Sequence, residues 1–155
     1  MLKRILQIVV IALFVAFVAI QFVRPDLTNP PVVAGQTLEA IASPPENVQA
    51  ILKRSCADCH SNTTVFPWYS QIAPVSWWLA DHIREGRREL NFSEWGAYAA
   101  NRKRRKLEEI CEQVEKREMP LPSYLWAHRD AQMSDEEIKI ICEWTRTEIE
   151  KIGSE

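Results

Sequence analysis

The hydrophobic pattern opens with a long apolar run. Residues 5–23 are almost wholly apolar and are interrupted only by Gln7 and Gln21. At about 1.5 Å of rise per residue, a helix of this length covers roughly the hydrocarbon thickness of a bilayer. Lys3 and Arg4 precede the run and predict a cytoplasmic N-terminus, because positive flanks stay on that side of the membrane. We therefore expect residues 1–23 to be a membrane anchor with the remaining chain outside the cytoplasm.

A cleaved signal peptide is the alternative for the same run. The run is longer than a usual signal core, and the nearest small-residue cleavage pattern, Val32-Val33-Ala34, is distant from it. We favour the uncleaved anchor. Both interpretations export the rest of the chain.

Beyond the apolar run, the pattern changes twice. Residues 24–42 hold three prolines and few periodic apolar positions, so we predict an extended linker. Ser43-Pro44-Pro45-Glu46 resembles a capping box with proline at the first helical position, so we expect a domain over residues 43–152 to begin there.

Apolar residues within that domain recur at helical spacing, which predicts an all-α fold. We expect helices from Ser43 into Cys56, over 75–90 and over 103–117, a short helical segment over 91–100, and a long helix that a second capping box, Ser134–Glu137, opens. The inward positions are Val48, Ile51, Leu52, Trp78, Leu79, Ile83, Leu90, Leu107, Ile110, Cys111, Val114, Ile138, Ile141, Cys142, Thr145, Ile149 and Ile152.

The charge distribution says more than the formal net charge of −2. Residues 84–106 carry a basic excess centred on 102–106, and acidic residues dominate after Leu107. A solvated helix start with ordinary i,i+4 pairs explains this pattern. A docking patch for an acidic redox partner or for anionic lipid headgroups is the functional alternative. We expect no nucleic-acid partner, because the chain is exported and slightly acidic.

The chemistry of the chain is concentrated in Cys56-Ala57-Asp58-Cys59-His60. This C-x-x-C-H spacing is the attachment pattern of c-type haem. Two thiols separated by two residues reach both vinyl groups of one porphyrin, and the adjacent imidazole binds its iron. A thioredoxin-like pair would sit near a βαβ pattern, and a zinc site would need a second ligand pair at suitable spacing. The sequence offers neither, so we predict one covalent haem c on Cys56 and Cys59 with His60 as the proximal ligand.

Met119 is the best candidate for the sixth ligand. It lies in the segment Met119-Pro120-Leu121-Pro122, which leaves the preceding helix because proline disfavours helical geometry before it. A thioether ligand raises the haem potential and suits electron transfer. A core-filling methionine is the plain alternative. If Met119 is not the ligand, we choose His82 next, ahead of Met133 and His128.

These residues lie in a wider pattern that resembles the bacterial haem-binding domain family related to cytochromes c. The resemblance covers about Ser43 to Ile149. It implies a small c-type haem domain that uses Cys56, Cys59, His60 and Met119. The shared motifs are Cys56-Ala57-Asp58-Cys59-His60-Ser61-Asn62, Phe66-Pro67-Trp68-Tyr69-Ser70, Ala73-Pro74-Val75-Ser76-Trp77, Gly86-Arg87, Leu90-Asn91-Phe92-Ser93-Glu94-Trp95, Glu118-Met119-Pro120 and Tyr124.

Two further sets of residues each have two interpretations. The six tryptophans fill the core or wall off the porphyrin; of the aromatic residues, we predict that Trp68 and Tyr69 contact the haem, because they closely follow the attachment site. Cys111 and Cys142 form either a disulfide outside the cytoplasm or two separate buried thiols.

The predicted function is that of a monohaem electron carrier on a single-pass anchor, with the haem domain on the periplasmic side of a bacterial cytoplasmic membrane. Such a carrier exchanges electrons with redox partner proteins and is not an enzyme. A haem-based enzyme or gas sensor with a displaceable sixth ligand is the alternative. A membrane-anchored interaction domain without haem is the third.

Overall fold

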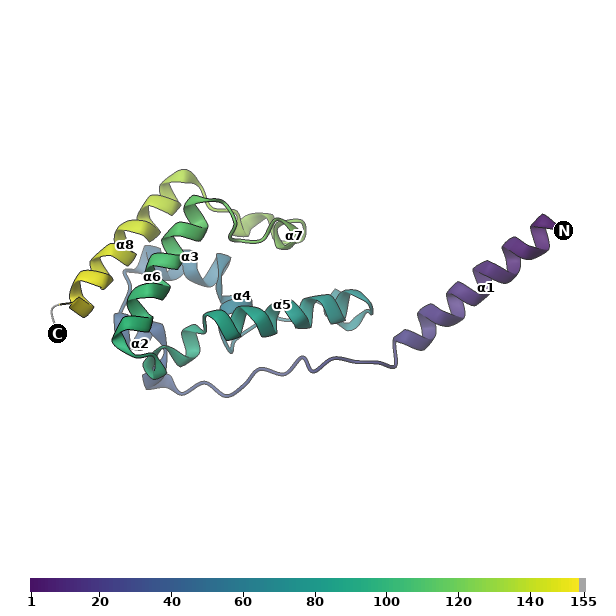
Figure 1. Ribbon diagram of the computed structural model, residues 1–155, viewed down its shortest axis with the longest axis horizontal. Coiled ribbons are helices and arrows are strands. Elements are labelled where there is room, and N and C mark those ends of the chain that lie inside the picture. The colour runs from purple at the N-terminus through teal and green to yellow at the C-terminus, as the bar shows by residue number, and fades with distance from the viewer. Residues whose placement is uncertain (154–155) are drawn as a thin grey trace. The chain divides into compact units, whose positions relative to one another are not determined.

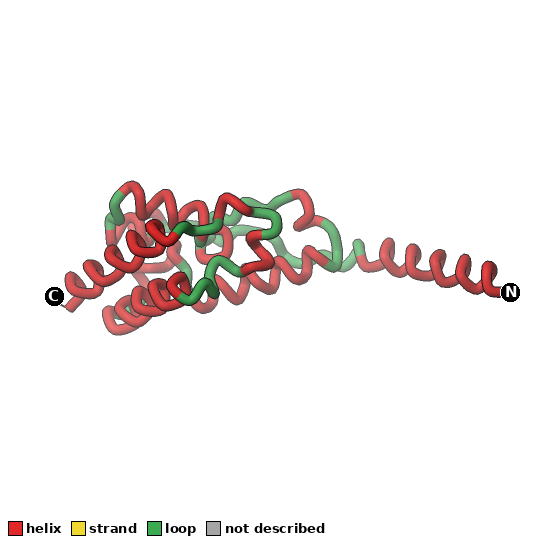
Figure 2. The backbone as a smooth tube through the Cα atoms, turned by 90° about the horizontal axis from the view of Figure 1, so that it is seen from above, coloured by secondary structure: helices red, strands yellow, loops and turns green. Residues whose placement is uncertain are grey.

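The computed structural model describes residues 1–153 and consists of helices joined by loops (Figures 1 and 2). No strand occurs among these residues, which confirms the all-α prediction. The α-helices are α1 (Leu2–Ile20), α2 (Leu38–Ala42), α3 (Glu46–Ser55), α4 (Ala57–His60), α5 (Val75–Glu89), α6 (Ala100–Glu115), α7 (Pro122–Leu125) and α8 (Asp135–Gly153). Short 3-10 helices are η1 (Ala34–Gln36), η2 (Trp68–Gln71), η3 (Phe92–Ala97) and η4 (Arg129–Ala131).

The chain forms two compact units, and the first combines residues 1–28 with 65–85. Its helix α1 has a mean hydropathy of 2.3 and no buried residue. It is long and apolar enough to cross a membrane, and a signal sequence has the same character. The N-terminal apolar helix is therefore confirmed.

The second unit combines residues 29–64 with 86–153 and is organised around the pair α6 and α8, which pack side by side (Figure 1). Apolar residues recur on one stripe of each helix, and the two stripes are buried. Leu107 of α6 is 0% exposed and Ile141 of α8 is 1% exposed. The core of this unit combines residues of α6 and α8 with residues of α2, α3, η3 and the loops between helices. Its other members are Leu38, Val48, Ile51, Leu52, Leu90, Phe92, Trp95, Tyr98, Ile110, Val114, Met133, Ile138, Cys142 and Trp144.

The start of this unit corrects the predicted linker over residues 24–42. The second half of that range folds into η1 and α2, and Leu38 is only 3% exposed in the core. Thr37 caps α2 by accepting a hydrogen bond from the Ala40 N–H at 3.1 Å. Proline content suggested an extended tether, but Leu38 and the partly buried Ala42 pack against the core, and α2 contacts η3.

The two predicted capping boxes have opposite outcomes. At Ser134, the Glu137 N–H donates to the serine Oγ at 3.2 Å, and the Ser134 N–H donates to the Glu137 carboxylate at 2.8 Å. That box is confirmed and opens α8. The box at Ser43 is wrong, because Ser43 adopts a left-handed conformation that ends α2, and α3 begins after Pro45 without a side-chain cap.

Cys111 of α6 and Cys142 of α8 form a disulfide, with their Cα atoms 4.8 Å apart. The bond joins the two helices that organise the core, and Cys142 is 2% exposed. A disulfide agrees with the oxidising compartment that the sequence predicts for this part of the chain. Glu115 lies near the two sulfurs, but sulfurs that bond each other are not thiolate ligands, so the trio does not form a metal site.

We expect the Cys111→Ala/Cys142→Ala variant to lose about 3 kcal/mol of unfolding free energy, because the closed loop restricts the unfolded chain. Denaturant titration of both proteins measures the loss. Wild-type protein kept in reductant is the control and should shift in the same direction. Equal midpoints for all three samples would contradict a stabilising disulfide.

Candidate functional site

The C-x-x-C-H segment forms a tight turn at the end of α3. Cys56 ends α3, and its carbonyl accepts hydrogen bonds from the Cys59 N–H at 3.2 Å and the His60 N–H at 3.0 Å. Helix α4 therefore spans only Ala57–His60. The turn brings Cys56, Cys59 and His60 onto one short segment of the chain.

Helix α5 passes very close to this turn at Gly86. A Cβ atom built on Gly86 would lie 2.7 Å from the Cys59 carbonyl oxygen and 3.2 Å from the Cys59 Cβ. Both close atoms belong to residues 56–60, here called the attachment turn after the haem attachment that the sequence predicts. One of them is a backbone atom, which cannot swing away. Only glycine permits this approach.

The close approach fixes the orientation of His60. Its Nδ1 atom lies 3.0 Å from the Gly86 carbonyl oxygen and 3.0 Å from that of Leu90. Carbonyls only accept, so Nδ1 carries the proton and Nε2 keeps a lone pair. Burial lowers the pKa of His60, and the positive charge of Lys106 acts in the same direction. The imidazole is thus neutral, orientated and ready to bind a metal through Nε2.

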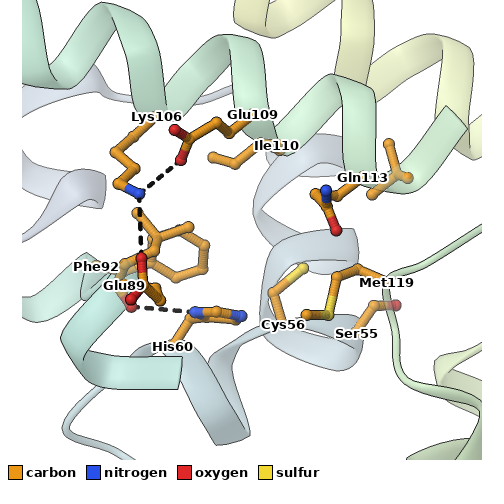
Figure 3. Close-up of a pocket in the computed structure, with 12 residues that line it drawn as sticks. Ser55, Cys56, His60, Glu89, Phe92, Lys106, Glu109, Ile110, Gln113 and Met119 are labelled. Carbon is orange, nitrogen blue, oxygen red and sulfur yellow. Dashed lines mark hydrogen bonds and ion pairs between the residues drawn. The ribbon is translucent and has the colours of Figure 1, made fainter. Parts of the chain in front are cut away.

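A cavity of about 310 Å³ opens beside His60 in the second unit. Figure 3 shows the imidazole bonded to a carbonyl at one end, with its other nitrogen directed toward Cys56 and Met119. The walls are mainly apolar, as is usual for a cofactor site. The lining residues are Ser55, Cys56, His60, Glu89, Leu90, Phe92, Lys106, Glu109, Ile110, Gln113, Val114 and Met119.

The end of α6 places Met119 in this cavity. The Glu118 and Met119 N–H groups both donate to the Gln113 carbonyl, at 3.0 and 3.2 Å. Arg117 takes a positive φ of 58° at the reversal, and its guanidinium donates to the Met133 carbonyl at 2.6 Å. The backbone at Met119 is therefore held by hydrogen bonds to the end of α6. These bonds restrict it in addition to the prolines that follow it in the sequence.

A comparison with known protein families bears on this cavity. A family model described as a haem-binding domain matches residues 15–147. The chain belongs to the haem-binding domain family. No curated protein and no solved structure matches it.

The residues that line the cavity fit a haem. A neutral imidazole with a free Nε2 and a thioether are the iron ligands of cytochrome c-type sites, and this haem-binding domain supplies both to one apolar cavity. Ser55 Oγ lies in the same wall, buried and without a hydrogen-bond partner in the described part of the chain. An orphaned hydroxyl of this kind indicates that a polar group of a ligand belongs there.

One part of the cavity wall is polar, and the sequence did not predict which residues form it. Lys106 has a side chain only 9% exposed, and its Nζ lies 2.5 Å from Glu109 and 3.8 Å from Glu89. In the sequence, Lys106 stands out only as part of the basic excess. Lys106 directly precedes the buried Leu107, and this position did not indicate that the lysine side chain points into the cavity. Ser55, Glu89 and Gln113 were likewise missed.

The two thiols are protonated at neutral pH. Burial raises the pKa of Cys56 to about 12 and that of Cys59 to about 11. Reactive C-x-x-C pairs instead lower a cysteine pKa to form thiolate. Cys59 does not line the cavity as Cys56 does, since its backbone is turned against Gly86.

Three predicted residues lie in the first unit. Trp68 is 77% exposed and stacks edge-on with Tyr69 at 5.9 Å. His82 contacts the Trp78 ring at 4.2 Å, and its Nδ1 lies 2.8 Å from the Trp78 carbonyl oxygen. None of the three residues is part of the cavity lining, and the haem-contact roles of Trp68 and Tyr69 stay predictions.

Tyr124 connects the Met119 side of the domain to the attachment turn. Its hydroxyl donates to the Asp58 carboxylate at 2.7 Å, and its ring stacks on His128 at 4.1 Å. Burial and the Asp58 charge raise the pKa of Tyr124 far above its ordinary value, so the hydroxyl keeps its proton. The bond therefore persists across the physiological pH range.

We expect Gly86→Ala to destabilise the domain by about 1–3 kcal/mol, because the new methyl group collides with the Cys59 backbone. Alanine would otherwise favour the helix by about 1 kcal/mol. Gly35→Ala is the matched control, since no atom lies within 4 Å of its added Cβ. Chemical denaturation of both variants decides the matter. Equal stabilities would show that α5 does not approach the turn so closely.

A double-mutant cycle tests the Tyr124–Asp58 bond. Tyr124→Phe and Asp58→Asn should each destabilise the domain, and the double variant should cost less than their sum by about 1 kcal/mol. Denaturant midpoints of the four proteins give the coupling. Strict additivity would mean that the two side chains do not interact in solution.

Proposed function

We propose that this haem-binding domain is a monohaem c-type cytochrome domain that carries electrons on the outer side of the cytoplasmic membrane. The observation that carries the proposal is that one cavity holds the His60 imidazole, with Nδ1 already bonded, and the Met119 thioether. When bound, haem supplies a one-electron ferric/ferrous couple. The chain supplies the anchoring, the ligands and the surroundings.

Each residue has a distinct task in this proposal. Cys56 and Cys59 would hold the porphyrin through thioether bonds, and His60 would bind the iron through Nε2. Met119 would supply the second protein ligand, a thioether, which favours ferrous iron. Leu90, Phe92 and Val114 keep water from the cavity and so keep the surrounding polarity low.

Electron transfer needs no substrate pocket and no proton transfer at the iron. We therefore propose that the chain is not an enzyme and that its partners are redox proteins. The basic excess supports this partly: Arg102 lies over the Tyr98 ring at 4.0 Å and Lys106 is buried, but Arg104 and Arg105 are exposed on α6. Those surface charges suit an acidic partner.

The location follows from α1. Lys3 and Arg4 favour a cytoplasmic N-terminus, which would place the domain in the periplasm. An extracytoplasmic location also agrees with the Cys111–Cys142 disulfide.

Replacing Met119 tests the proposal. Protein produced in cells that export the chain and attach c-type haem to it should retain one haem after denaturation. The mass of the protein should increase by the mass of that haem. Its ferric and ferrous visible spectra should be low-spin. We expect Met119→Ala to keep the covalent haem but to turn high-spin, because the sixth ligand is lost.

Met133→Leu is the matched control. Met133 is also buried, at 3% exposure, but lies in the core and not on the cavity lining, and leucine conserves its volume. Its spectra should match those of the wild type. If Met119→Ala also kept the wild-type spectra, another group would hold the sixth position. Protein that loses all colour on denaturation would refute covalent attachment.

A further inference from the structure

A stretch without charge follows the attachment turn, and it is not buried. Residues 65–80 contain no Asp, Glu, Lys or Arg, although charged residues make up 26% of the chain. Several large apolar side chains of this stretch nevertheless face outward. The exposed fractions are 76% for Val65, 77% for Trp68, 37% for Ile72, 41% for Val75 and 44% for Trp78. Exposed apolar surface of this kind marks a contact with something other than water.

The end of the apolar helix is bonded directly to this stretch. The Ala73 N–H donates to Gln21 Oε1 at 2.9 Å, and Gln21 Nε2 donates to the Ala73 carbonyl at 3.1 Å. A single amide side chain thus satisfies both backbone groups of one residue 52 positions away. This pairing explains why a polar residue interrupts the apolar run at position 21.

Two further observations show that the stretch packs against the helix end. Trp77 Nε1 donates to the Val23 carbonyl at 2.6 Å. Ser70 and Ser76, at 0% and 3% exposure, lie beside a small cavity of about 70 Å³ whose other wall comes from residues 21–27. The link between helix end and stretch is therefore continuous and does not depend on one contact.

We infer that residues 65–78 form a membrane-interface platform that lies in the headgroup region of the bilayer beside α1. This inference rests on the proposed anchor. If α1 crosses the bilayer, its C-terminal end lies at the outer interface, and the stretch bonded to that end lies at the same depth. Tryptophan is enriched in this layer, because its ring is apolar and its N–H is polar.

The platform gives the anchor a second role. Cleavage near Ala34 would remove Gln21 and Val23 and, with them, the hydrogen bonds to Ala73 and Trp77. The stretch is thus built for a chain that keeps its anchor. The next charged residues along the chain are Asp81, Arg84 and Glu85. The platform therefore ends within α5.

Site-directed spin labels measure whether the platform contacts lipid. Trp68→Cys, Val75→Cys and Trp78→Cys are each labelled in the full haem-loaded chain in phosphatidylethanolamine/phosphatidylglycerol vesicles. The unsubstituted chain reports any label taken by native cysteines. Arg84→Cys is the control, since Arg84 belongs to the same unit and its side chain is 72% exposed. Oxygen concentrates in lipid and a nickel chelate in water, so their relaxation effects report depth.

We expect the oxygen-to-nickel accessibility ratio at positions 68, 75 and 78 to be severalfold higher than at 84. Ratios equal to that at 84, in chain that stays with the vesicles, would overturn the platform and leave the anchor standing. Shielding from both reagents would mean contact with protein, a second copy or a partner, and would also overturn it. Chain that does not stay with the vesicles would refute the anchor itself, and the platform with it.

Discussion

The close approach of α5 to the attachment turn is the constraint on which the site depends. Gly86 lets the helix backbone reach the Cys59 carbonyl, and the carbonyls of Gly86 and Leu90 then come within 3.0 Å of His60 Nδ1. One packing contact therefore sets the tautomer and the orientation of the imidazole, while burial lowers its pKa and favours the neutral form. Without it, His60 would be a half-buried side chain free to turn either nitrogen toward the cavity.

The same segment ties the attachment turn to the rest of its unit. Arg87, next to Gly86, donates to the Ser61 carbonyl at 2.8 Å and to the Thr64 hydroxyl at 2.8 Å. Asn62, directly after the turn, is 3% exposed and accepts a hydrogen bond from the Asn91 amide at 2.9 Å. Polar residues on both sides of the turn are thus satisfied internally, and the turn keeps its shape.

Residues with a periodic or motif signal were predictable from sequence. The apolar stripe of α8, the turn at Cys56 and the helix starting at Val75 all appear where their patterns place them. The segment around Leu38 was not predictable, because one buried leucine among prolines has no period. Lys106 was hidden for a different reason. A lysine in a run of basic residues looks solvated, and only the packing of α6 turns it into the cavity.

Iron K-edge X-ray absorption on the exported, purified chain would show whether a haem iron is held between His60 and Met119. We expect one iron per chain with a single sulfur ligand in addition to nitrogen ligands, and loss of that sulfur signal when Met119 is replaced. Iron surrounded by nitrogen and oxygen alone, or a chain without iron, would contradict a haem held between His60 and Met119.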